Sequence, residues 1–448
     1  MGRDDVILDG QGFSLEEPGY MPDFTIIGID VVGNRRNVTI RNLNIVDGRY
    51  NAAIHLFNCT DFNITNNTIV GNHYSIWIEY SNDTIITNNV FNRNDRLFLN
   101  SSYRNRITDN DLIEHNGNID IEYSDNNYIS QNNMTSSSSV LGLYVSNNNT
   151  ITDNKIIGKY QPYSLYGFTL QAIAICYSSH NIVEGNTLYG HQWGLDMAYA
   201  RNNIITDNNI QNNTVGIRFY DYEGIQQFEN SSSNIFFHNN LMDNNQTVVI
   251  MTPSTNDWNN GAEGNYWSDY NGTDNNQDGI GDTPYIIDAN NTDHYPLMGT
   301  LCIFNVRHDY TGRIEKVAII SNSTVEKVGH YWIDNGSTPG GYSWFLGLTG
   351  VVGKEGTVGF CRITFPNDMM NSSSYPVWLG APEGTEIYGK IVESNGTYTT
   401  LYFTYSLPVS RSEIWILPEF PSYLILPLFF ITTLFGVIVY RKRRTKVT

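Results

Sequence analysis

The sequence predicts an all-β protein: a right-handed parallel β-helix solenoid, then a small immunoglobulin-like β-sandwich and a C-terminal transmembrane helix. Three observations predict this order: a phrase that recurs roughly every 22 residues, strand-like sequence without that repeat after it, and an apolar stretch near the C-terminus. The expected boundaries are 1–260 for the solenoid, 261–300 for an aromatic and Asp-rich loop segment, 301–417 for the sandwich and 418–448 for the anchor with its basic tail.

The recurring phrase is an apolar residue, two polar residues, an Asn, one more residue and another apolar residue. Ile64 to Ile69 is one copy, and two of the intervals between copies are about ten residues longer than the rest. Such insertions are typical of a solenoid, because each coil contacts only its neighbours and extra residues bulge outward. Copies begin at Ile40 (a variant with Leu43 at the Asn position), Ile64, Ile86, Ile107, Ile129, Ile151, Val183, Ile205 and Phe236.

Each copy is preceded by a strand. Ten and eight residues before the leading apolar residue lie two more apolar residues, as with Ile54 and Leu56 before Ile64. This spacing of two indicates a strand. The Leu-x-x-Leu-x-Leu phrase of leucine-rich repeats is missing, so a parallel β-helix is favoured over that fold. We therefore expect parallel strands that stack at about 4.8 Å. Residues 6–10 are expected to belong to one further coil.

The repeated Asn is expected to be structural. Its amide carries donors and an acceptor, so equivalent residues on successive coils can hydrogen-bond along the stack, and Asn tolerates the backbone of a sharp bend. The column would contain Asn67, Asn89, Asn110, Asn132, Asn154, Asn186, Asn208 and Asn239.

Composition restricts the possible partners. The formal net charge is −19 at pH 7, which argues against nucleic acid, because that binding needs a basic surface. Dense N-glycosylation sequons suit an exported glycoprotein, although the Asn-Thr phrase itself generates some of them. The sequons include Asn37, Asn63, Asn148, Asn212, Asn322 and Asn395.

The C-terminus predicts a membrane anchor. Ser422 to Tyr440 is an uncharged apolar stretch of 19 residues, and the basic run 441–444 follows it directly. Basic residues stay in the cytoplasm, so the rest of the chain is expected on the extracellular face. Residues 418–421, Pro-Glu-Phe-Pro, resemble the archaeal Pro-Glu-Phe sorting signal. No apolar leader follows Met1, so we expect the start to lie inside a longer reading frame.

An Asp-rich loop predicts a Ca²⁺ site. Oxygen ligands stand at positions 1, 3, 5 and 9, with Gly279 at position 6 and the carbonyl of position 7, as in an EF-hand-type or thrombospondin-type loop. Tyr285 replaces the usual Glu at position 12, so Asp288 or Asp293 would have to complete the site. The alternative is an ordinary Asx-rich turn. The expected ligands are Asp274, Asn276, Asp278, Ile280 and Asp282.

Residues 301–415 alternate strand-like runs with turn residues, as in an antiparallel sandwich. Expected strands include Lys316–Ile320, Thr357–Thr364 and Tyr398–Tyr405. Cys302 and Cys361 could bridge the two sheets. Cys59 and Cys176 fall in coils too far apart to pair.

Candidate binding and catalytic residues stand at the outward positions of the first strand of each coil. Rings and carboxylates mix there, as in a sugar-binding groove. Asp120 and Glu122 would lie roughly 7 Å apart, a spacing compatible with an inverting glycosidase; the alternative is a solvated acidic face. A lyase needs a base beside Ca²⁺-binding acids, and this face offers Arg218 alone. The expected carbohydrate-binding residues are Trp77, Glu79, Phe98, Asp120, Glu122 and Tyr144.

The repeat phrase, together with Asn265 to Tyr270 and the continuation Asp278 to Tyr285, resembles the NosD family. The resemblance covers roughly residues 6–297 and implies a right-handed β-helix with carbohydrate-binding or sugar-hydrolase-type repeats, common in archaeal surface proteins. The family name comes from copper delivery, but this sequence lacks a Cys, His or Met cluster at ligand spacing.

Together these observations predict a non-catalytic cell-surface protein that binds carbohydrate or cell-envelope glycan. A polysaccharide hydrolase or lyase is the alternative, and NosD-like copper handling is the third. Ca²⁺ is the one cofactor expected. The membrane is the second expected partner, through the C-terminal helix.

Overall fold

A computed structural model shows two compact units, one formed by Met1–Gly272 with Thr283–Leu297 and the other by Thr273–Asp282 with Met298–Thr448. Within the ranges it describes, the chain forms strands, turns and irregular segments and no helix. The described residues are 3–16, 26–46, 51–93, 96–115, 119–136, 140–158, 171–220, 230–309, 311–334, 342–353, 356–370, 372–379, 385–406 and 412–418.

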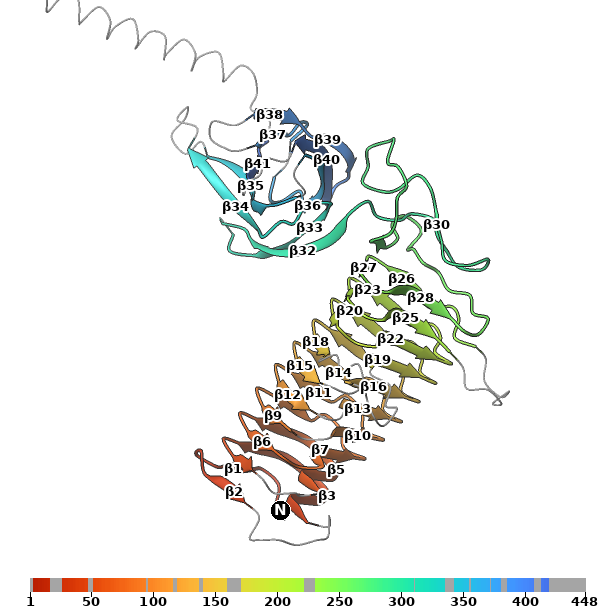
Figure 1. The fold of residues 1–448 in the computed structure, drawn as a ribbon. Coiled ribbons are helices and arrows are strands. Elements are labelled where there is room, and N and C mark those ends of the chain that lie inside the picture. The colour runs from red at the N-terminus through yellow and green to blue at the C-terminus, as the bar shows by residue number, and fades with distance from the viewer. Residues whose placement is uncertain are drawn as a thin grey trace, which may run out of the picture. The chain divides into compact units, whose positions relative to one another are not determined.

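The first unit is a parallel β-solenoid of about nine turns (Figure 1). An 18-stranded sheet runs the length of the stack and an 11-stranded sheet runs beside it. The larger sheet contains β1 (Val6–Asp9), β3 (Ile27–Arg41), β5 (Ala52–Thr65), β7 (Tyr74–Glu79), β8 (Ile85–Thr87), β10 (Arg96–Asn100), β11 (Arg106–Thr108), β13 (Ile119–Glu122), β14 (Tyr128–Ser130), β16 (Leu141–Tyr144), β17 (Thr150–Thr152), β19 (Gln171–Cys176), β20 (Ile182–Glu184), β22 (Trp193–Ala198), β23 (Ile204–Thr206), β25 (Val215–Phe219), β26 (Ile235–Phe237) and β28 (Gln246–Ile250). The smaller sheet contains β2 (Ser14–Glu16), β4 (Asn44–Val46), β6 (Thr68–Val70), β9 (Val90–Asn92), β12 (Asp111–His115), β15 (Asn133–Ser136), β18 (Lys155–Gly158), β21 (Thr187–Tyr189), β24 (Asn209–Gln211), β27 (Asn240–Met242) and β29 (Tyr266–Trp267).

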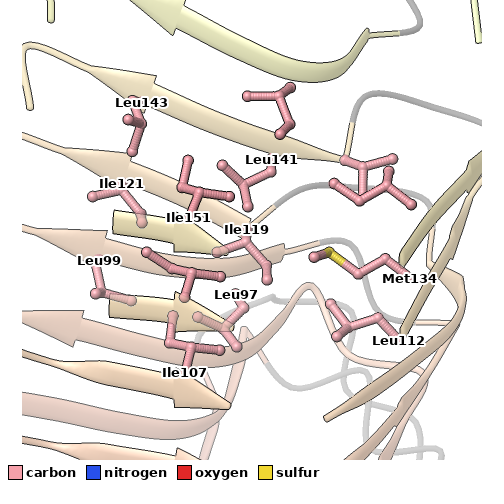
Figure 2. Close-up of a cluster of buried hydrophobic side chains, with 14 of the residues drawn as sticks. Leu97, Leu99, Ile107, Leu112, Ile119, Ile121, Met134, Leu141, Leu143 and Ile151 are labelled. Atoms are coloured by element: carbon pink, nitrogen blue, oxygen red, sulfur yellow. The ribbon is translucent and has the colours of Figure 1, made fainter. Parts of the chain in front are cut away.

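The strand register confirms the predicted repeat. Ile119 lies beside Leu97 and Leu141, and Ile121 lies beside Leu99 and Leu143. Alternate residues therefore point into the solenoid, where they form one continuous hydrophobic core (Figure 2). The expected additional coil is also present, because β1 pairs in parallel with the end of β3, with Leu8 opposite Ile40.

The predicted asparagine column is confirmed. The Asn132 side chain donates to Asn154 Oδ1 at 2.9 Å and to the Ile107 carbonyl at 2.8 Å, and its Oδ1 accepts from the Asn110 backbone and side chain at 3.1 and 3.0 Å. Because Asn132 is 1% exposed, these bonds satisfy a polar group that burial would otherwise penalise.

A second asparagine column was not predicted. Over the copies that begin at Ile107 to Phe236 it stands two residues before the leading apolar residue, and it continues through two further asparagines. Its amides bond from coil to coil, as in the 3.1 Å bond from Asn105 Nδ2 to Asn127 Oδ1. A column of serine hydroxyls accompanies it, with Ser81 N donating to Ser102 Oγ at 3.1 Å. The second column contains Asn105, Asn127, Asn149, Asn181, Asn203, Asn234, Asn256 and Asn291.

The second unit contains two five-stranded antiparallel sheets that share one hydrophobic core. The immunoglobulin-like assignment stays a prediction. One sheet has the order β32 (Thr300–Arg307), β33 (Ile314–Ser321), β36 (Val358–Pro366), β40 (Tyr398–Ser406), β39 (Lys390–Ser394), and the other β34 (Lys327–Asp334), β35 (Tyr342–Val351), β41 (Ser412–Ile416), β37 (Pro376–Leu379), β38 (Thr385–Tyr388).

The expected disulfide is wrong. Cys302 and Cys361 lie in β32 and β36, two strands of the same sheet separated by β33, and not in opposite sheets. Because β33 lies between them, their strands stand about 10 Å apart, beyond the reach of a disulfide. All four cysteines are free thiols.

The predicted anchor, Ser422 to Tyr440 with its basic tail, lies outside the described residues. Where the chain is described, no helix has the length and apolar character needed to cross a bilayer.

Candidate functional site

The predicted outward positions align in two columns on the larger sheet. One column runs through Asp30, His55, Trp77, Phe98, Asp120, Gly142, Ala174, Asp196 and Arg218. The other runs through Val32, Phe57, Glu79, Asn100, Glu122, Tyr144, Cys176 and Ala198. All six predicted carbohydrate-binding residues therefore lie together on four successive strands, β7, β10, β13 and β16. We call this surface the outward face.

Aromatic rings cluster at the first part of the outward face. Trp77 stacks against Tyr74 with ring centroids 5.1 Å apart, and Tyr74 stacks against Phe98 at 5.8 Å. The His55 ring lies 4.7 Å from Trp77. Phe98 is 9% exposed and Trp77 is half-buried. Tyr74 was missed from the sequence because it stands at the start of β7, before the register shift that separates it from the outward columns.

His55 lies between two carboxylates. Its Nδ1 is 2.8 Å from Asp30 Oδ1 and its Nε2 is 3.5 Å from Glu79 Oε2. Asp30 thus holds an aromatic neighbour of Trp77 in place, and Glu79 lies beside the same ring.

Asp120 and Glu122 differ in their surroundings. Burial raises the pKa of Glu122, and the Asp120 carboxylate raises it further, while Arg96 opposes both effects. Asp120 Oδ2 lies 3.6 Å from Arg96 Nε. Glycine at position 142 leaves room for this carboxylate, because a Cβ there would stand 3.2 Å from Asp120 Oδ1. The pair therefore combines a carboxyl group of raised pKa with one that is ion-paired.

An ion pair between Arg218 and Asp196 lies at the C-terminal end of the outward face. Arg218 Nε and Nη2 donate to the two oxygens of Asp196 at 2.7 and 2.8 Å, and Gln171 Nε2 donates to Asp196 Oδ2 at 3.0 Å. The guanidinium also lies over the rings of Trp193 and Tyr220, at 3.5 and 4.1 Å from their centroids. Because Asp196 is fully buried, Arg218 neutralises it, and in this arrangement the guanidinium is not poised as the base of a lyase.

A row of tyrosines beside the outward face was also missed. Tyr80, Tyr123, Tyr177 and Tyr199 each directly follow a residue of the second outward column. Tyr123 and Tyr144 have ring centroids 6.1 Å apart, Tyr144 and Tyr177 5.5 Å, and Tyr177 and Tyr199 4.7 Å. The sequence shows that these tyrosines share one position of the repeat. That position lies in the turn after a strand, where the repeat gave no reason to expect contacts between rings.

The Asp-rich loop closes on itself. Asp274 accepts bonds from the backbone of Asp278 and Gly279 at 3.0 and 2.9 Å, and Asp278 Oδ1 accepts from Ile280 N at 2.8 Å. Asp282 Oδ2 accepts from Asn275 N at 2.7 Å. Within the described residues, His, Cys, Asp and Glu side chains form no group of three arranged to hold a metal ion. Ca²⁺ binding by this loop stays a prediction.

The Asp-rich loop also contacts the antiparallel unit to which it belongs. Lys390 Nζ donates to the carbonyls of Asn276 and Gln277, the latter at 3.2 Å. Burial raises the pKa of Tyr402 to about 12, with a further contribution from the Asp274 carboxylate. The loop is thus tied to β39 and β40 by polar contacts.

Comparison with known proteins identifies the family. The model described as "Periplasmic copper-binding protein (NosD)" matches residues 25–169 and 95–272, which together span more than half of the chain. The chain belongs to the NosD family. A curated relative, the probable ABC transporter binding protein NosD of Stutzerimonas stutzeri, is 34% identical over 83 residues. The match covers 18% of this chain and 17% of that protein, so the chain spans less than a fifth of its relative's length. A periplasmic family is consistent with an extracellular location.

Two solved structures are among those to which the chain is similar. The periplasmic alginate epimerase AlgG is 16% identical, with a TM-score of 0.44 over 51% of this chain and 59% of that one. DFA-IIIase from Arthrobacter chlorophenolicus A6 is 14% identical, with a TM-score of 0.33 over 54% and 64%. At these values the likeness carries no information on activity.

Four of the described histidines contact other groups of the protein. His55 and His238 each lie between two carboxylates. His308 and His330 lie close together, with ring centroids 4.5 Å apart, but outside the region that matches NosD. Their Nε2 atoms face backbone carbonyls at 3.2 and 3.0 Å, and their Nδ1 atoms accept from backbone amides at 3.3 and 3.4 Å. Both rings are therefore engaged in bonds that hold the fold together.

Proposed function

We propose that this NosD-family protein binds carbohydrate on its outward face and does not cleave it. The observation that carries the proposal is the alignment of rings and carboxylates on successive coils. Trp77 and Tyr144 supply flat apolar surface of the kind that packs against the apolar face of a sugar ring. Glu79, Asp120 and Glu122 supply oxygens that can accept hydrogen bonds from sugar hydroxyl groups.

A glycan array tests this proposal. Purified protein should bind a defined set of glycans, and Trp77→Ala should weaken that binding by about three- to tenfold. Trp332→Ala is a matched control, because Trp332 is 52% exposed and lies in the antiparallel unit. The proposal fails if the wild-type protein binds no glycan, or if the two substitutions have equal effects.

Hydrolysis is the second candidate function, favoured by the Asp120 and Glu122 pair. A carboxyl group with a raised pKa beside an ion-paired carboxylate is the arrangement of a general acid and a general base. In that reaction Glu122 would protonate the leaving oxygen, while Asp120 would take a proton from the attacking water. Release of reducing ends from a polysaccharide, stopped by Glu122→Gln and by Asp120→Asn, would establish hydrolysis and overturn the non-catalytic proposal.

We further propose that the protein works outside the cell, held at the membrane by residues 422–440. The length of that apolar stretch and the basic run after it support this placement. Membrane fractionation of cells that express the chain with and without residues 418–448 tests it. Equal release of both forms into the medium would contradict an anchor.

A further inference from the structure

The corner beside the outward face uses residues that its backbone does not favour. Tyr80, Tyr123, Tyr177 and Tyr199 have φ values of 50°, 51°, 52° and 53°. These values lie in the left-handed region, where bulky side chains are rare and Asn, Asp and Gly are common. Four aromatic residues in this conformation, at the same corner of different coils, therefore need an explanation.

One other corner of the same coils carries mainly the residues expected there. Directly before the first asparagine column, the left-handed residues include Asn66, Asn88, Asp109, Asp153 and Asp207. The tyrosine corner itself accepts Asn as well: Asn58, with φ 56°, is the equivalent of Tyr80, because Phe57 and Glu79 are paired. The backbone thus does not require tyrosine at this corner, and an asparagine would adopt it with less strain.

Burial does not explain all of these tyrosines either. Tyr80 and Tyr123 are 54% and 50% exposed, whereas Tyr199 is 6% exposed. Tyr144, at 42% exposed, joins the row from the neighbouring outward column. The rings of Tyr123, Tyr144, Tyr177 and Tyr199 form a continuous series that crosses four strands, β13, β16, β19 and β22. Strands of this kind are spaced about 4.8 Å apart, so the series runs along the solenoid axis.

We infer that the tyrosine row is a binding surface for a glycan chain that lies along the axis, and that the glycan is neutral or carries amino groups. This inference rests on the carbohydrate-binding function proposed above. The chemical class follows from charge, because Glu79 and Glu122 directly precede Tyr80 and Tyr123. These carboxylates repel uronic acids and sulfated sugars, and they attract hydroxyl and ammonium groups. An acidic polysaccharide is therefore a poor match for this surface.

Tyr123→Asn separates a binding role from a structural one. Loss of a ring contact should weaken binding of chito-oligosaccharides by about three- to tenfold, while the Tm stays equal or rises because the strained tyrosine has been replaced. Tyr123→Phe should keep the affinity. Tyr128→Asn is the matched control, since Tyr128 lies on the next strand of the same coil, against Arg106. It should leave affinity unchanged.

Titration calorimetry with three probes tests the chemical class: acetylated chito-oligosaccharides, deacetylated ones and oligogalacturonates. The inference predicts binding of the first two and little binding of the third. Preferential binding of oligogalacturonates overturns the chemical class. Two results with Tyr123→Asn would overturn the role of the tyrosine row without affecting the proposal of glycan binding. One is loss of stability or failure to fold, and the other is binding as tight as that of the wild-type protein. Wild-type protein that binds no probe and no arrayed glycan overturns the proposed function itself.

Discussion

The backbone N–H of Asn265 donates to Asp293 Oδ2 at 2.8 Å, so a carboxylate ends the asparagine column that begins at Asn67. The same oxygen accepts from Trp267 Nε1 at 2.9 Å, and Asp293 Oδ1 accepts from Tyr295 N at 3.0 Å. Asp293 is fully buried. These bonds tie the segment 283–297 to the last coils of the solenoid.

The pH dependence of stability should reveal this carboxyl group. Burial raises its pKa above 3.8, although four hydrogen bonds oppose the shift. The folded protein therefore keeps a proton that the unfolded chain has released, and the contribution of Asp293 to stability falls as the pH rises from about 3.8 through the folded pKa. Asp293→Asn cannot ionise and should remove this fall. Urea unfolding at about pH 4 and about pH 7 measures it; an equal difference between variant and wild type at both pH values would contradict the prediction.

Removing one amide from the middle of a column should be costly. Asn132→Ala removes the oxygen that accepts from the Asn110 backbone and side chain, and the N–H that donates to the Ile107 carbonyl, in a buried site. We expect this loss to lower the free energy of unfolding by about 1 to 3 kcal/mol. Asn133→Ala is the control, because the neighbouring Asn133 is exposed and bonds to Asp111 at its surface. A melting transition as high for Asn132→Ala as for the control would refute the structural role of the column.

His238 should stabilise the protein below pH 9. Burial of the ring lowers its pKa, but Asp207 and Glu263 outweigh that effect and raise it to about 9. The contribution to stability is complete below the unfolded pKa near 6.5 and is lost as the pH rises through about 9. His238→Gln should cost roughly 2 to 3 kcal/mol at about pH 6 and much less at about pH 10. Thermal melts across this pH range measure the effect, with the exposed His180→Gln as a control. If the ion pairs contribute nothing, the difference in Tm between His238→Gln and the wild-type protein would be the same at every pH.

Calcium should be tested on the whole chain, because Lys390 and Tyr402 contact the Asp-rich loop. If the loop binds Ca²⁺ in the folded state, millimolar Ca²⁺ should raise the Tm by mass action. Asp278→Ala should abolish the rise. Asp368→Ala, at an exposed position of the same unit, should preserve it. Absence of any rise in the wild-type protein would identify the loop as an Asx-rich turn.

Sequence reasoning predicted those features that the repeat itself encodes. Ile54, Ile76 and Leu97 stack because each coil buries the same positions, and the Asn67 column follows from one residue of the phrase. The second column was equally periodic, with Asn105 two residues before Ile107, but it lay outside the phrase that defined the repeat.

Features that depend on particular contacts could not be predicted. Tyr74 joins the ring cluster through a register shift at β7 and β10, which no repeat spacing encodes. The pairing of Arg218 with buried Asp196 depends on side-chain geometry between neighbouring coils. The disulfide prediction failed because alternation identifies strands without assigning them to one sheet or another, and Cys302 and Cys361 share a sheet.

Both asparagine columns have an electrical polarity. Where one side-chain amide bonds to another, Nδ2 donates toward the next coil and Oδ1 accepts from the previous one, as for Asn132. These amide dipoles add, so each column is positive at its C-terminal end. Each of these ends meets a carboxylate: Asn265 faces Asp293, and Asn291 Nδ2 donates to Asp288 Oδ1 at 2.9 Å. An anion at the positive end is favourable, as at the N-terminus of an α-helix. Because the carboxyl oxygens of Asp293 and Asp288 accept the last bonds and carry no amide group, the series of amide-to-amide bonds stops at this end of the solenoid.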